Sequence, residues 1–302
     1  MRQKILFVLV LTAVVFVYQR LRFQQELQLI FCDVGQGDAT LVQWRDFEIL
    51  VDGGPNDAVL SCLGQHLSYF DRTIEFVIAT HQDSDHIGGL ASVLANYKVD
   101  TLIWNGEDKE TADFLGFYEA IQREQLNGTQ VIEAQHGESY QVTDLFRFRL
   151  WVPRVVERVQ TVSIEQKCEK QLQDTLQSLV AKQPSANDGS IVTFIEFGTT
   201  TVLLMGDLET RGELTLVCSG LLRPTTIVKA GHHGSKSSST REFIAATQPE
   251  YVVFSSGKNN RFGHPSPEVM SRYELVKSVQ LRTDQLGTIV LLSDGSRVWR
   301  SN

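Results

Sequence analysis

The chain has 302 residues, of which 42% are hydrophobic and 21% are charged, so it can bury an ordinary globular core. This length fits one large α/β domain or two small ones, and no repetitive or low-complexity segment interrupts it. A formal net charge of −8 argues against a tight phosphate-backbone partner unless a local basic patch or bridging metal ions offset that charge.

The first residues combine a charged start with an apolar run. Arg2 and Lys4 precede the apolar residues 5–18, and two arginines follow. This order is typical of a secretory signal, but no small-x-small cleavage site follows it. The run is also short for a membrane span, which needs about 20 apolar residues. We expect residues 1–24 to be an uncleaved signal anchor. A cleaved signal peptide and a buried core helix are the alternatives.

The first half of the chain predicts strands interleaved with helices, which favours a layered α/β fold. Apolar runs bounded by turn residues predict strands at 27–32, 39–43, 47–51, 76–79, 101–104, near 131 and at 146–152. Helical spacing predicts helices at about 58–69, 87–96 and 111–125.

The most informative stretch is T-H-Q-D-S-D-H-I-G-G at residues 80–89. His81, Asp83, Asp85 and His86 fall within six residues, directly after the apolar strand 76–79. A strand that ends in such a cluster can aim several imidazoles and carboxylates at one point. Zinc, manganese and iron accept this donor set, so the sequence predicts a metal site here.

The second half restarts the same plan. A hairpin at 190–197 and 201–205 ends in Gly206-Asp207, as the hairpin at 39–51 ends in Asp52-Gly53. A helix at 209–218, a strand at 226–228 and the pair His232-His233 follow. Two halves that each deliver an acid and then histidines indicate a duplication, with the metal held at the junction.

A segment of about residues 155–185 separates the halves. Its apolar residues recur at i, i+4 spacing over 164–182, which predicts an amphipathic helical insertion packed on the domain surface; membrane or partner binding is the alternative. The four cysteines form no C-x-x-C pair, and we expect Cys32 to be a buried apolar residue. Their even number permits disulfides in an exported domain without requiring them.

Seven motifs follow one another along the chain, at residues 33–39, 52–54, 81–89, 187–190, 206–209, 232–236 and 263–266. Taken in order, they resemble the motifs of the metallo-β-lactamase-fold hydrolases. More specifically, they resemble the hydrolase domain of the ComEC-type competence (DNA-uptake) proteins. The resemblance implies an αββα sandwich over residues 25–302, with a dinuclear metal centre where its two sheets meet.

The resemblance also implies a ligand set. His81 and Asp83 would serve one metal ion, Asp85 and His86 the other, and Asp207 would bridge the two. The fold's usual third histidine of the first metal falls near Asn187 in this chain. Asn187 therefore replaces a histidine, and so does Asp83, because the wider fold has histidine at that position. Amide and carboxylate oxygens are harder donors than imidazole nitrogen, so the two divalent ions would be zinc or manganese.

The last ligand stays open between His233 and His264. His232, or whichever of His233 and His264 does not bind metal, would contact the substrate. The candidate catalytic residues are Asp85, His232 and His233. Asp52 is expected to hold histidine rings through hydrogen bonds. Asp38 is either a loop-bracing residue or a functional one. The serines of 235–238 would suit a phosphate or cap the helix predicted at 240–246.

The chemistry implied is hydrolysis by a metal-activated water. The chain has no Gly-x-Ser-x-Gly, P-loop or dinucleotide-binding fingerprint. The leading hypothesis is a hydrolase of phosphodiester bonds, with nucleic acid as one candidate substrate, on the outer (periplasmic or extracytoplasmic) face of a bacterial inner membrane. The alternatives are an exported hydrolase of another ester, lactone or cell-envelope phosphoester, and a non-catalytic metal-stabilised binding module.

Overall fold

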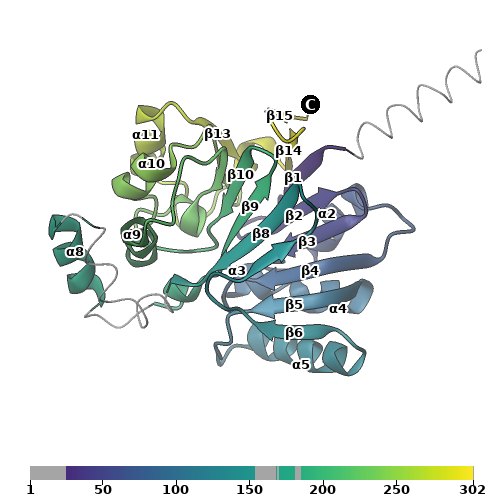
Figure 1. The fold of residues 1–302 in the computed structure, drawn as a ribbon. Helices are drawn as coiled ribbons and strands as arrows, with labels where there is room; N and C mark the ends of the chain where they lie inside the picture. The colour runs from purple at the N-terminus through teal and green to yellow at the C-terminus, as the bar shows by residue number, and fades with distance from the viewer. Residues whose placement is uncertain (1–24, 154–167, 169, 181–184, 302) are drawn as a thin grey trace, which may run out of the picture.

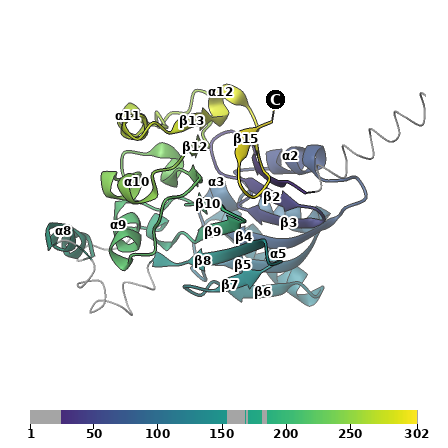
Figure 2. The same cartoon turned by 45° about the horizontal axis from the view of Figure 1, so that its top comes forward.

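The computed structural model describes residues 25–153, 168, 170–180 and 185–301. Two β-sheets pack face to face, and helices cover their outer faces (Figure 1). Figure 2 shows the same layers from a second side, with α9, α10 and α11 gathered on one side of the molecule. The predicted αββα sandwich is confirmed.

The first sheet has eight strands within the described residues, and its order is not the chain order. Across the sheet the strands are β15 (Val298–Arg300), β14 (Ile289–Ser293), β1 (Leu27–Phe31), β2 (Thr40–Trp44), β3 (Phe47–Val51), β4 (Thr73–Ala79), β5 (Lys98–Trp104) and β6 (Gln130–Glu133). The last strands of the chain therefore return to the sheet that the first strands begin.

The second sheet has seven strands in the same described part of the chain. In spatial order they are β13 (Val279–Arg282), β12 (Tyr251–Phe254), β11 (Ile227–Lys229), β10 (Thr200–Leu204), β9 (Val192–Phe197), β8 (Phe146–Trp151) and β7 (Ser139–Gln141). Strand β8 shows why the sheets face each other: Phe146, Phe148 and Leu150 enter the central core, whereas Arg147 and Arg149 alternate to the opposite face.

The helices divide between the two sheets. Against the first sheet pack α2 (Ala58–His66), α4 (Leu90–Asn96) and α5 (Ala112–Leu126), and against the second pack α9 (Thr210–Ser219), α10 (Arg241–Thr247) and α11 (Pro267–Leu275). The side chains of Thr111, Thr240 and Ser266 cap the starts of α5, α10 and α11. The short α12 (Thr283–Leu286) follows β13.

The two halves share the predicted plan. In the first, β2 and β3 pair antiparallel, and β3 pairs parallel with β4. In the second, β9 and β10 pair antiparallel, and β10 pairs parallel with β11. The carboxyl ends of β3, β4, β10 and β11 lead into the loops that carry the motif residues, which is what places those residues at one junction.

The helix predicted at 87–96 is instead two helices, α3 (Ser84–Ile87) and α4. The amide of Gly89 donates to the carbonyl of Gly54, outside the helix. A Cβ on Gly89 would lie 2.2 Å from the carbonyl oxygen of Gly53, so only glycine permits this approach. Because α3 starts at Ser84, it takes Asp85 and His86 out of the predicted loop and onto a helical turn.

The cysteines pair in the structure. Cys32 is buried, as predicted, but it is bonded to Cys62 on α2, so its reading as a plain apolar residue is wrong. Cys168 is bonded to Cys218 on α9. The sequence could not give these partners, because spacings of 30 and 50 residues carry no local signal.

Within the predicted insertion, the described part is α8 (Lys170–Val180), whose Leu172 and Leu179 pack against Leu214 and Cys218 of α9. Over that range the helix contacts α9, as expected for a helix packed on the domain surface. The predicted anchor at 1–24 lies outside the described residues. None of the helices in the described part of the chain combines the length and the apolar character needed to cross a bilayer.

Candidate metal centre

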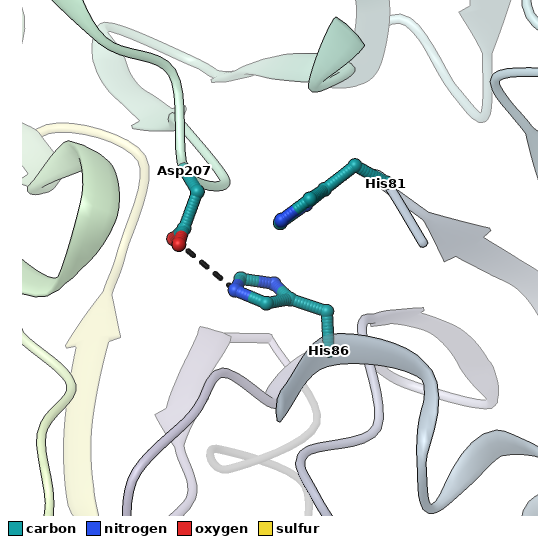
Figure 3. A group of neighbouring side chains, drawn as sticks. All are labelled: His81, His86 and Asp207. Carbon is teal, nitrogen blue, oxygen red and sulfur yellow. Dashed lines mark ion pairs between the residues drawn. The ribbon is translucent and has the colours of Figure 1, made fainter. Parts of the chain in front are cut away.

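Side chains from both halves meet at the junction of the sheets. His81 follows β4, His86 lies on α3, and Asp207 follows β10. Figure 3 shows these three side chains directed at a common point. One donor atom from each lies within 4.8 Å of the others, and all three side chains are buried.

The donor atoms of this group are buried and form no hydrogen bond with the described residues. The Nε2 of His86 lies 3.1 Å from Oδ1 of Asp207, and the His81 and His86 ring centroids are 4.2 Å apart. The Nε2 atoms of both histidines and Oδ1 of Asp207 are buried without a hydrogen bond. Buried polar atoms normally find partners, so this convergence of orphaned donors fits a bound divalent metal ion.

A second group adjoins the first. Asp85, His86 and His233 bring their donor atoms within the same 4.8 Å limit. His233 Nε2 lies 3.3 Å from Oδ2 of Asp85 and 3.4 Å from Oδ2 of Asp207. Its Nδ1 donates to the carbonyl of Ser255 at 2.9 Å, which leaves Nε2 free to bind metal.

The two oxygens of Asp207 face different histidines. Oδ1 lies next to His86 Nε2, whereas Oδ2 lies next to His233 Nε2. Attraction to His233 and His86 outweighs the effect of burial and holds the pKa of Asp207 well below its usual range. The carboxylate is therefore ionised and can offer both oxygens.

Asp52 orients the ligands from behind. It accepts hydrogen bonds from the amide and the hydroxyl of Thr80, both at 2.8 Å, and its Oδ2 lies 2.7 Å from Nδ1 of His86. With Nδ1 held by Asp52, Nε2 of His86 points into the centre. The predicted hydrogen bond between Asp52 and a histidine ring is confirmed, with His86 Nδ1 as the donor.

Asp38 forms a buried ion pair with Lys229, a residue that the sequence did not single out. Lys229 also donates to the carbonyl of Gly206 at 2.9 Å. Burial acts to raise the pKa of Asp38, but Lys229 and His233 outweigh it and lower the pKa. Asp38 Oδ1 lies 3.3 Å from His233 Nδ1, so this carboxylate is part of the centre's inner wall.

Two predicted metal ligands, Asp83 and His264, lie at the edge of the candidate metal centre. The Oδ1 of Asp83 pairs with Lys109 Nζ at 2.5 Å, and its Oδ2 lies 3.9 Å from His81 Nε2. The His264 ring centroid lies 6.5 Å from that of His233 and 5.5 Å from that of His232. Neither residue joins a group of donor atoms within 4.8 Å in the described part of the chain.

Burial and charge shift the histidines in opposite directions. Burial, helped by the neighbouring His86, lowers the pKa of His81 to about 4. For His233 the carboxylates of Asp207 and Asp38 outweigh the effect of burial and raise the pKa to about 9. A divalent ion must displace such protons from its ligands, so metal binding here is expected to release protons.

His232 lies on the open side of the centre. Its Nδ1 lies 2.9 Å from Oε1 of Glu209, and its Nε2 lies 3.7 Å from Oδ2 of Asp207. Ser237 donates to the same Glu209 oxygen at 2.8 Å. Burial raises the pKa of Glu209, but hydrogen bonds from His232 and Ser237 outweigh that effect and lower it. Glu209 was missed as a functional residue, although it belongs to the Gly-Asp-Leu-Glu motif.

Asn187, at the position of the fold's usual third histidine, contacts this pair. Its Nδ2 lies 3.3 Å from Nδ1 of His232. A carboxylate accepts hydrogen bonds but does not donate them, so Nδ1 of His232 carries a hydrogen and donates it to Glu209. The other ring nitrogen, Nε2, faces Asp207. His232 has φ 45° and His233 φ 53°, a left-handed backbone that costs non-glycine residues energy and that these contacts hold in place.

The chain belongs to the metallo-β-lactamase superfamily, whose family profile matches residues 32–258. It is 29% identical to ComE operon protein 3 of Bacillus subtilis (strain 168) over 91% of this chain, and 28% identical to competence protein ComA of Neisseria gonorrhoeae over 88%. It is 26% identical to recombination protein 2 of Haemophilus influenzae over 85%. The chain spans 34%, 32% and 28% of these relatives' own lengths, respectively.

Solved structures support the fold. The metallo-β-lactamase fold protein YhfI from Bacillus subtilis matches with a TM-score of 0.51 at 13% identity, over 91% of this chain and 100% of that one. Tm1679, described as a metal-dependent hydrolase of the β-lactamase superfamily, matches with a TM-score of 0.50 at 13% identity, over 85% of this chain and 95% of that one. The chain is a hydrolase of this superfamily that is related to competence proteins and carries candidate metal-binding groups of histidine and aspartate.

Proposed function

We propose that the protein hydrolyses phosphodiester bonds with two divalent metal ions. The observation that carries the proposal is the position of Asp207, which joins one group of close donor atoms with His81, assigned to the first ion, and another with His233, assigned to the second. A carboxylate so placed can bridge two cations. When bound, such ions lower the pKa of a shared water and polarise the phosphoryl oxygen.

The donors divide between the two ions as follows. His81 and Asp83 would hold the first, and Asp85, His86 and His233 the second, with Asp207 shared. For the last ligand of the second ion we favour His233 over His264, because only His233 brings a donor atom within 4.8 Å of Asp85 and His86 in the described part of the chain. Both zinc and manganese accept this mixture of imidazole and carboxylate.

The chain's own residues would supply the proton chemistry. Asp85 is ionised, because hydrogen bonding and attraction from the nearby histidines outweigh burial and lower its pKa, so it can accept a hydrogen bond from the attacking water. His232 lies on the open side of the centre with Nε2 3.7 Å from Oδ2 of Asp207, and from this position it would give a proton to the departing oxygen. Glu209 is a positioning residue, because it accepts the hydrogen bond from Nδ1 of His232 and so fixes the orientation of that ring.

The phosphodiester class rests on the relatives whose names refer to competence and recombination. The net charge of −8 favours the competing candidate, a hydrolase of an exported ester that carries no phosphate backbone. Two bound cations and local basic residues would offset that charge for a nucleic-acid substrate.

A substrate panel tests the proposal. Metal-stripped protein is reloaded with zinc or manganese and assayed on bis(4-nitrophenyl) phosphate, on single-stranded and duplex DNA, and on a nitrophenyl ester and a lactone. Asp207→Asn serves as the inactive control. We expect phosphodiester cleavage that needs added metal and is absent in the control. Cleavage of the ester or lactone alone would replace the proposal with the competing one, and metal binding without any turnover would favour a binding module.

We also propose that residues 1–24 attach the protein to the bacterial inner membrane, with the catalytic domain on the outer side. Strand β1 runs from Leu27 to Phe31, and the loop after Phe31 enters the centre with Asp38. The junction at Gln25 therefore lies at the opposite end of β1, so an anchor there would hold the centre away from the bilayer. Fractionation of the full chain and of one starting at Gln25 tests this; equal solubility of two uncleaved chains would refute the anchor.

A further inference from the structure

The loop between β12 and α11 exposes an aromatic ring beside the centre. We call residues 257–264 the rim loop. The Phe262 side chain is 54% exposed, and its ring stacks on His264 with centroids 5.7 Å apart and planes 24° apart. The guanidinium of Arg261 lies 5.0 Å from the centroid of the same ring. The ring therefore has an imidazole and a cation as neighbours, while more than half of its side chain stays exposed.

This stack leads directly into the centre. The His264 ring centroid lies 5.5 Å from that of His232, at an interplanar angle of 77°. His232 in turn presents Nε2 toward Asp207. Phe262 is therefore separated from the proposed proton donor by one imidazole ring.

The rim loop is built in advance by its own hydrogen bonds. Asn260 Nδ2 donates to the carbonyls of Gly257 and His264 at 3.0 and 2.7 Å, and the amide of His264 donates back to Asn260 Oδ1 at 3.0 Å. The amide of Gly257 donates to the side chain of Gln36 in the opposite half. Such bracing lowers the ordering cost of binding, because the ring does not have to be positioned by the ligand.

The charge of the rim loop suits an anionic ligand. Residues 257–264 include Lys258 and Arg261 and no acidic residue, in a chain of net charge −8. Both basic side chains belong to exposed residues. A local basic patch next to an exposed aromatic ring is the combination that binds single-stranded nucleic acids, in which phosphates meet cations and bases stack on rings.

A single exposed aromatic residue is ordinary on a protein surface. Tyr69 and Phe70 are more exposed than Phe262, at 80% and 91%, but they lie in the loop before β4, at the opposite end of that strand from His81. What distinguishes Phe262 is its stacking on a histidine of the centre, its braced loop and its basic neighbours.

We propose that the rim loop is a base-stacking subsite. Phe262 would take a nucleobase of a single-stranded nucleic acid whose phosphodiester lies at the metal centre, and Arg261 and Lys258 would contact flanking phosphates. This proposal rests on the proposed function and narrows it from phosphodiesters in general to those that carry bases.

The test compares two ligands that differ only in their bases. Binding of a fluorescent single-stranded oligonucleotide and of an abasic strand of equal length is measured by anisotropy on full-length, detergent-solubilised, metal-stripped protein, so that cleavage does not interfere. Stacking of one base is worth about 1–3 kcal/mol, which corresponds to roughly 5- to 150-fold in affinity. We expect the base-bearing strand to bind tighter than the abasic strand by a ratio within that range.

Three variants locate the effect. Phe262→Ala should remove the preference for bases and leave binding of the abasic strand unchanged, whereas Phe262→Trp should keep the preference. Phe70→Ala is the matched control, an exposed aromatic residue away from the centre, and should behave as wild type. Metal content after reloading should be the same in all three. A duplex of the same sequence should bind more weakly than the single strand, because its bases are already stacked on each other.

Equal binding of the two strands by the wild type, or a preference that survives Phe262→Ala, would overturn the subsite. Tighter binding of the duplex would overturn its single-strand character. The outcome is separable from that of the proposed function, because binding does not require turnover. A protein that cleaves phosphodiesters without preferring bases loses only the subsite. A protein whose Phe262 selects bases but that cleaves no phosphodiester loses only the proposed function.

Discussion

Glu209 Oε1 lies 2.9 Å from Nδ1 of His232, and this contact sets which nitrogen of that ring faces the metal centre. The carboxylate accepts a hydrogen bond from Ser237 as well, so it is held in place before substrate binds. The two residues are 23 positions apart: Glu209 lies between β10 and α9, His232 follows β11, and the parallel pairing of β10 with β11 brings them together.

Glu209→Gln should lower kcat by roughly ten- to a hundredfold and leave KM and metal content nearly unchanged, because glutamine no longer fixes the ring as a carboxylate does. The loss should be large for phosphodiesters with poor leaving groups and small for those that release nitrophenolate, which needs no proton. Glu242→Gln, an exposed change of equal charge on α10, should match the wild type. An equal loss on both classes of substrate would mean that Glu209 does not act through proton donation by His232.

The two histidines left open by the sequence should separate in a metal titration. His233→Ala should lose about one bound ion, because His233 Nε2 lies within 3.4 Å of both Asp85 and Asp207. His264→Ala should keep both ions, because His264 joins no close donor group in the described part of the chain. Metal analysis after dialysis decides the matter. The reverse result would move the ligand to His264.

Glu48 should make stability fall as pH rises. Its side chain is buried on β3, and burial, which outweighs the hydrogen bond from Gln43, raises its pKa to about 8 from an ordinary 4.5. The folded state therefore binds the proton more tightly than the unfolded one. This stabilisation is complete below about pH 4.5 and is lost as pH rises through about 8, at about 1.4 kcal/mol per unit of pKa difference.

Urea unfolding at pH 5 and pH 8 checks this. Glu48→Gln should reduce the slope between the two pH values and should be more stable than the wild type at pH 8. The exposed Glu242→Gln should keep the wild-type slope. If wild type and Glu48→Gln lose stability equally between pH 5 and pH 8, Glu48 is not the group responsible.

The disulfide between Cys32 and Cys62 should contribute to stability. It joins the segment after β1 to α2 across 30 residues, and cross-links of this kind typically stabilise by about 2–4 kcal/mol. The double variant Cys32→Ala, Cys62→Ala should lower the free energy of unfolding by that amount. Removal of the Cys168–Cys218 pair should have a smaller effect on global unfolding and should instead increase proteolysis near α8. Equal unfolding curves for the wild type and for Cys32→Ala, Cys62→Ala would contradict a stabilising role of the disulfide between Cys32 and Cys62.

The layered architecture could be predicted from the sequence, and so could the grouping of the motif residues that follow the strands. His81, His86 and Asp207 could be predicted because each follows an apolar strand and belongs to a dense motif. The strands β12 to β15 and the helices α11 and α12 were not predicted. These strands have only three to five residues, and the return of β14 to the side of β1 depends on pairing across the whole chain.

The residues that the sequence missed act through distant partners. Lys229 ends an apolar strand, and its role depends on Asp38, which lies 191 positions earlier. Glu209 precedes a helix, where an acidic residue is ordinary, and its role depends on His232. Phe262 is one aromatic residue in a polar loop, and only the three-dimensional arrangement stacks it on His264. Local patterns identify donors, but they do not identify which donors meet.

The central claim is that Asp207 bridges two metal ions, and a metal count on the wild type and on Asp207→Ala tests it most directly. We predict two ions per wild-type chain, and fewer than two together with loss of turnover in the variant, because both oxygens of Asp207 serve the centre. His81→Ala, as a comparison, should reduce occupancy chiefly at one site. Two tightly bound ions retained in Asp207→Ala, or a single ion in the wild type, would contradict the account.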